Sequence, residues 1–65
     1  MQDPVKLEVK LAYDLFLTRR DDWSEEYTKA YPTYDDAVES ARFFLSNFPT
    51  GYVRGIIREV YVAKS

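Results

Sequence analysis

The chain has 65 residues, neither cysteine nor histidine, and a formal net charge of −2 at pH 7. A chain of this length holds one small core, so we expect a single domain over residues 1–65. The lack of cysteine excludes disulfide-stabilised miniproteins, and the lack of histidine removes the commonest catalytic base and nitrogen metal ligand. A hydrophobic content of 46% is too high for a disordered segment, and the negative charge argues against a general nucleic-acid binder.

The N-terminal residues are polar, and the segment after them alternates between apolar and charged side chains. Signal peptides and membrane-spanning helices instead need a continuous apolar run. We therefore expect a cytoplasmic protein that makes no contact with membranes.

Residues 5–17 carry the clearest periodic pattern. Valine, leucine and tyrosine occupy every odd position, whereas the even positions are mostly charged or small. This alternation predicts a β-strand whose odd positions are buried and whose even positions face water.

A predicted hairpin follows. Residues 19–22 are two arginines and two aspartates, and aspartate favours turns. A weaker alternation then begins at residue 23 or 24 and continues to Tyr31, with no purely apolar face. This pattern is typical of an edge strand, which Pro32 ends because proline has no amide hydrogen for a sheet ladder.

The next segment has the signals of a helix start. Thr33 is a candidate N-cap, and Asp35 and Asp36 fall in the first turn, where carboxylates interact favourably with the helix dipole. The spacing predicts a helix over residues 34–47, with Phe43 outside its apolar stripe. The stripe consists of Tyr34, Ala37, Val38, Ala41, Phe44, Leu45 and Phe48.

Residues 49–51 end the helix, and residues 52–62 predict a third strand. Ile56 and Ile57 interrupt its alternation directly after Gly55. A β-bulge at Gly55 explains the interruption, and so does a strand that is partly covered on both faces; the sequence leaves both open.

These elements predict an α+β domain with a three-stranded antiparallel sheet and one helix packed on one face, in the order strand, strand, helix, strand. A right-handed crossover places the third strand beside the first, so we expect the spatial order 2-1-3. The strongly alternating first strand is then central.

No arrangement of residues predicts catalysis. The serines have no histidine to activate them, and adjacent carboxylates such as Glu25 and Glu26 point to opposite faces of a strand. Phosphate-loop, calcium-loop and zinc-ligand spacings do not occur. We expect no enzymatic activity, no cofactor and no metal site.

Surface recognition is the remaining class of function. Tryptophan and arginine dominate interface hot spots, and we expect one rim, between the hairpin turn and the third strand, to hold Arg19, Arg20, Trp23, Arg54 and Arg58. The alternatives are that Trp23 folds back over the sheet edge and that the arginines only lie on a solvent-exposed face of the sheet. Asp35, Asp36 and Glu39 form an acidic strip at the helix start, which serves solubility or a basic partner.

Two runs, YTKAYPTYDDAVESA at residues 27–41 and FPTGY at residues 48–52, resemble the small host RNA polymerase inhibitor of T-seven-like podophages. The resemblance covers roughly residues 27–64 and implies the same fold. It implies that Arg58 matches one of the family's two polymerase-contacting arginines. Ile56 stands at the other position, and Arg54 lies two residues earlier. It also implies that the acidic strip faces the polymerase or its sigma factor.

The resemblance implies a non-catalytic phage protein that inhibits or modulates bacterial host RNA polymerase by occluding one of its surfaces in the host cytoplasm. A second hypothesis is a nucleic-acid-binding module that uses Tyr52, Arg54, Arg58 and Tyr61, although the net charge opposes it. A third is a small structural or assembly subunit, monomeric or weakly dimeric through a strand edge.

Overall fold

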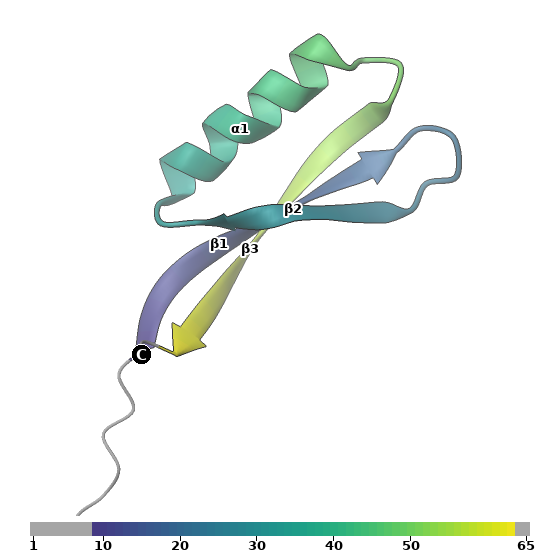
Figure 1. The fold of residues 1–65 in the computed structure, drawn as a ribbon. Helices are drawn as coiled ribbons and strands as arrows, with labels where there is room; N and C mark the ends of the chain where they lie inside the picture. The colour runs from purple at the N-terminus through teal and green to yellow at the C-terminus, as the bar shows by residue number, and fades with distance from the viewer. Residues whose placement is uncertain (1–8, 64–65) are drawn as a thin grey trace, which may run out of the picture.

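The computed structural model describes residues 9–63, which form one antiparallel sheet and one helix. The elements are β1 (Val9–Arg19), β2 (Glu25–Tyr31), α1 (Tyr34–Asn47) and β3 (Tyr52–Ala63). The sheet has the order β2-β1-β3, and α1 lies across one of its faces (Figure 1). The predicted α+β class, element order and central first strand are confirmed. The predicted start of that strand at residue 5 lies outside the described residues.

The helix has the predicted bounds because its N-cap forms as the sequence indicates. The Thr33 hydroxyl accepts a hydrogen bond from the Asp36 amide at 3.1 Å, which satisfies one of the free donors of the first turn. At the other end, the Phe48 amide donates to the Phe44 carbonyl at 2.9 Å, and the chain then turns into β3.

The core lies between α1 and the centre of the sheet. Leu15 and Leu17 of β1 are fully buried and pack together with Ala41 of the helix, and Ala37 of the helix is also buried. Small helix residues at this interface let the helix backbone approach the sheet closely. Larger side chains that are only partly buried surround this centre: Tyr31, Phe44, Tyr52 and Ile57.

Gly55 allows this close approach, and of the two explanations that the sequence leaves open, the bulge at this residue is wrong. β3 pairs with β1 in unbroken register from Val9–Ala63 to Thr18–Arg54, and Gly55 pairs with Leu17. A Cβ atom on Gly55 would lie 3.1 Å from the Ala41 Cβ. The residue is therefore a glycine because the helix packs directly onto it. The two isoleucines after it are both half-buried, as expected of a strand covered partly on both faces.

The two register shifts of the sheet lie elsewhere. On β3, Tyr52 pairs with Arg19 and Arg54 with Thr18, so Val53 between them has no partner. On β2, Thr28 and Lys29 together face one residue of β1. The Thr28 hydroxyl donates to the Leu15 carbonyl at 3.0 Å, and this hydrogen bond takes the place of a backbone bond between the strands at the shift.

The even-numbered face of β1, which we call the open face, is less solvated than the alternation predicts. Thr18 is 1% exposed because the Arg54 side chain lies across it and donates from Nε to its hydroxyl at 3.2 Å. Ala12 is 4% exposed, since its methyl group is short and lies beside Val60 of β3. The prediction of a uniformly wet face is therefore wrong at these two residues.

Candidate functional site

The turn between β1 and β2 has a fixed backbone geometry. The Arg19 amide donates to the Ser24 carbonyl at 2.8 Å, and the Trp23 amide donates to the Arg19 carbonyl at 2.9 Å. The Asp22 carboxylate accepts from both the amide and the hydroxyl of Ser24, at 3.0 and 2.7 Å. We call residues 19–24, together with the loop at residues 48–51, the hairpin end.

Trp23 is held in this turn with a left-handed backbone. Its φ is 61°, and no other non-glycine residue among residues 9–63 has a positive φ. For an L-amino acid this conformation costs roughly 1–2 kcal/mol. The side chain is 68% exposed, so it does not fold back over the sheet edge, and that alternative is wrong.

The positive charge of Arg19 is compensated within the hairpin end. Its guanidinium lies 2.8 Å from the Asp21 carboxylate, 3.5 Å from Glu26 and 3.8 Å from Asp22. Hydrogen bonding from Arg19 lowers the pKa of Asp21 to about 2, and the same contacts raise the pKa of Arg19. Arg19 is therefore a structural clamp of the turn and presents little free charge to a partner.

Arg20 joins the hairpin to the loop between α1 and β3. Its Nε donates to the Pro49 carbonyl at 3.1 Å, and its amide donates to the Gly51 carbonyl at 2.9 Å. A cleft of about 300 Å³ lies beside this junction. Phe48, which is 49% exposed, and Tyr52 line the cleft. The hairpin end thus offers an exposed indole, an exposed phenyl ring and one arginine whose charge has no acid partner among the described residues.

Arg54 and Arg58 share the open face, as the phase of β3 predicts, and Arg54 pairs with Thr18, the residue directly before Arg19. The Arg58 guanidinium stacks 5.0 Å from the centroid of Phe16 and lies 3.4 Å from the Glu25 carboxylate. Phe16 in turn packs against Tyr27 at 5.4 Å between centroids. Arg54 therefore lies close to the hairpin end, as expected, and Arg58 lies four residues further along β3, paired with Asp14.

Tyr52 does not share a face with Arg54 and Arg58, since the register shift at Val53 reverses its direction. Its ring packs edge-on against Phe44 of the helix at 6.3 Å, and its hydroxyl donates to Glu26 at 2.6 Å. That hydrogen bond and burial raise the pKa of the Tyr52 hydroxyl.

Tyr61 lies in the opposite phase from the two arginines, because it pairs with Leu11 and no shift intervenes. This is the phase that β3 predicts without a bulge, and of the four residues of the nucleic-acid hypothesis only Arg54 and Arg58 share the open face.

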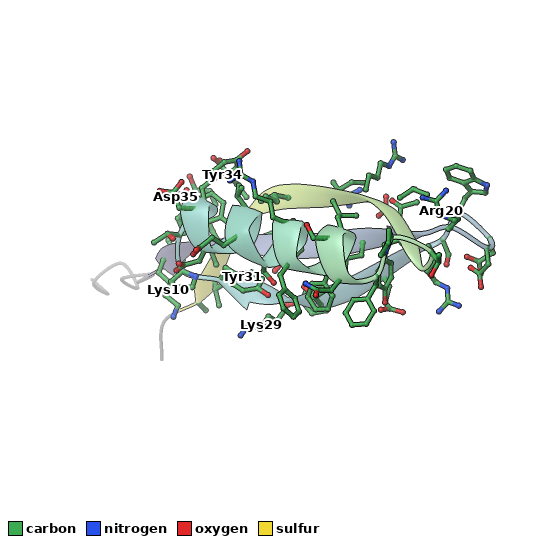
Figure 2. All side chains as sticks on the ribbon, turned by 90° about the horizontal axis from the view of Figure 1, so that it is seen from above. Lys10, Arg20, Lys29, Tyr31, Tyr34 and Asp35 are labelled. Atoms are coloured by element: carbon green, nitrogen blue, oxygen red, sulfur yellow. The ribbon has the colours of Figure 1, made fainter. Side chains whose placement is uncertain are left out.

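The acidic strip forms at the helix start, but at the other end of the molecule. Figure 2 shows Tyr34 and Asp35 at one end of the sheet and Arg20 at the opposite end. Asp35, Asp36 and Glu39 are all exposed. The strip and the hairpin end are thus two separate surfaces that one small contact cannot cover.

A cleft between β2 and α1 was not predicted. Its volume is about 510 Å³, and its lining includes Tyr31, Phe43 and Phe44. The Tyr31 hydroxyl is hydrogen-bonded to Ser40, and the Lys29 ammonium lies 5.0 Å from the Tyr31 ring (Figure 2). The position of Phe43 outside the helical stripe was the signal for this cleft, since an aromatic there has no core to enter.

Residues 9–63 contain no group of three or more acidic side chains placed to hold a metal ion. Their one helix is too short and too polar to cross a membrane. Comparison with protein-family models, with curated proteins and with solved structures finds no match to this chain.

Proposed function

We propose that the chain is a non-catalytic protein-binding domain that contacts its partner through the hairpin end. Bacterial RNA polymerase, whose surface the domain would occlude to inhibit or modulate transcription, is the partner that the resemblance suggests. Arg54, Arg58 and the acidic strip are secondary contacts in this proposal.

The observation that carries the proposal is the conformation of Trp23. A residue in an unfavourable backbone region normally has a compensating contact or a function, because such strain persists only where the surrounding structure imposes it. Here the turn hydrogen bonds impose it, while the indole is 68% exposed. An exposed tryptophan is the residue type that contributes most often to hot spots, and its burial by a partner would offset the strain.

The test is affinity capture from bacterial lysate with the wild-type chain and with Trp23→Ala, followed by transcription in vitro. We expect polymerase subunits to be recovered with the wild type and transcription to fall when the chain is added. Trp23→Ala should weaken binding roughly 30-fold or more, the effect of a 2 kcal/mol hot spot.

Phe43→Ala is the matched control, because Phe43 is 58% exposed but lines the cleft between β2 and α1 and not the cleft at the hairpin end. Its affinity for the partner should equal that of the wild type. The proposal fails for polymerase if no subunit is captured and transcription is unaffected. The proposal for the hairpin end fails if the two alanine variants weaken binding equally.

A further inference from the structure

The two edges of the sheet differ in how they are protected against pairing. β2 has seven residues, a register shift at Thr28 and Lys29, and Pro32 directly after it. Short length, irregularity, lysine and proline are the features by which edge strands avoid added strands. β3 has twelve residues, and its register is regular over residues 54–63, a stretch without lysine or proline. Its outer edge is therefore the one open to pairing.

The backbone groups on this outer edge can be identified from the pairing of β1. The Leu15 carbonyl and the Arg19 amide both bond toward β2, so odd-numbered residues of β1 direct their backbone groups to that side. Because successive residues alternate, even-numbered residues of β1 direct theirs to β3. Their partners on β3 are the even-numbered residues 54–62. The amides and carbonyls of the odd-numbered residues 55–63 are consequently left on the outer edge.

We infer that this edge binds a second copy of the same chain, through antiparallel β3–β3 pairing about a two-fold axis at Ile57. Ile57 then faces its own counterpart, Gly55 faces Glu59, and Ile56 faces Arg58. The dimer is a six-stranded sheet in which the outward residues Gly55, Ile57 and Glu59 of each copy find partners. It goes beyond the proposed function, since the hairpin end is not part of this edge.

The charges of β3 select this register. An axis at Arg58 places two arginines opposite each other, and an axis at Glu59 places two carboxylates opposite each other; both arrangements are unfavourable. An axis at Val60 avoids these pairs but leaves Gly55 and Ile56 without partners among the described residues. The axis at Ile57 pairs residues 54–60 of one copy with residues 54–60 of the other and places no like charges face to face.

The first test is sedimentation of the wild type over a concentration series, alongside Glu59→Pro and Glu59→Thr. The Glu59 amide points outward, so proline removes no bond to β1, and edge strands tolerate it there. By symmetry it removes two bonds between copies, which should weaken dimerisation roughly 30-fold. Glu59→Thr loses the charge but keeps the amide, and it should dimerise like the wild type. A wild type that is monomeric throughout the series overturns the inference and leaves the edge to a strand of another protein. Equal dimerisation of the two variants also overturns the inference.

The second test fixes the register and does not depend on the proline variant being folded. The chain has no cysteine, so Ile56→Cys and Arg58→Cys each introduce a single thiol. In the proposed register these two residues are a non-hydrogen-bonded pair with Cα atoms about 4.5 Å apart, within disulfide range. An oxidised equimolar mixture should form a heterodimer disulfide, while Arg58→Cys alone should not. Cross-linking of Arg58→Cys alone, or no cross-linking in the mixture, refutes the register.

Discussion

Gly55→Ala tests the close approach of the helix to the sheet. The added Cβ would lie 3.1 Å from the Ala41 Cβ, 3.4 Å from Leu15 Cδ1 and 3.7 Å from Leu17 Cδ2. The backbone φ of Gly55 is not positive, so alanine meets no conformational strain there. Loss of glycine's flexibility in the unfolded chain would by itself stabilise the protein by about 0.4–1 kcal/mol.

The packing effect has the opposite sign and should be larger. The contact to Ala41 is shorter than an ordinary carbon–carbon contact, and both partners lie on rigid elements, so the helix must move away from the sheet. Overpacking of this kind costs about 1–3 kcal/mol. We therefore expect Gly55→Ala to destabilise the fold by about 1–2 kcal/mol. In a domain of this size, that lowers Tm by roughly 5–15 °C.

The assay is thermal and urea unfolding followed by circular dichroism, with Gly51→Ala as the matched control. A Cβ on Gly51 would meet nothing closer than the Phe48 carbonyl oxygen at 3.6 Å, so this variant should be neutral or slightly more stable.

The double variant Gly55→Ala with Ala41→Gly should be less destabilised than the sum of its parts by at least about 0.5 kcal/mol, because the second change makes room for the first. A Gly55→Ala protein as stable as the wild type, with additive single effects, would refute the close approach.

Three further predictions concern the turn and the helix start. Trp23→Gly should raise stability by about 0.5–1 kcal/mol in thermal unfolding, since relief of the left-handed strain exceeds the entropy cost of glycine, and a lower Tm would contradict the backbone assignment. Thr33→Ala should lower stability by about 1 kcal/mol through loss of the N-cap, whereas the exposed Thr50→Ala should change it little. Because the pKa of Asp21 is lowered from 3.8 to about 2 in the fold, its stabilising contribution is complete above its unfolded pKa and is lost as the pH falls toward about 2. Urea midpoints should therefore fall over this acid range more for the wild type than for Asp21→Asn.

The fold could be predicted because its signals are local and repeated. The alternation up to residue 17 and the apolar stripe of the helix each extend over many residues, so single exceptions do not change the result. The start of the helix could be predicted from one short segment, Thr33 and the carboxylates that follow it. The strand order then follows from connection rules and from the position of the most regular strand.

The errors all depend on contacts between distant segments. At residue 55, a bulge and a close helix contact both favour glycine, and only the position of Ala41 in the fold distinguishes the two explanations. Tyr52 has the same parity as Arg54, and the register shift at Val53 that separates them leaves no local signal. The contact of Arg19 with Glu26 likewise forms only when the hairpin closes, and it adds a third carboxylate to those of Asp21 and Asp22.

The distribution of the aromatic residues links the fold to its use as a binding surface. The chain has six tyrosines, four phenylalanines and one tryptophan, all within residues 9–63, and none is buried. The centre of the core is instead made of two leucines, two alanines and a glycine, because the helix packs so close to the sheet that larger rings do not fit. The aromatic side chains therefore lie around this centre, and several of them line the clefts. A core built this way does not need Trp23, Phe43 or Tyr61, so these exposed rings are free to serve recognition without determining stability.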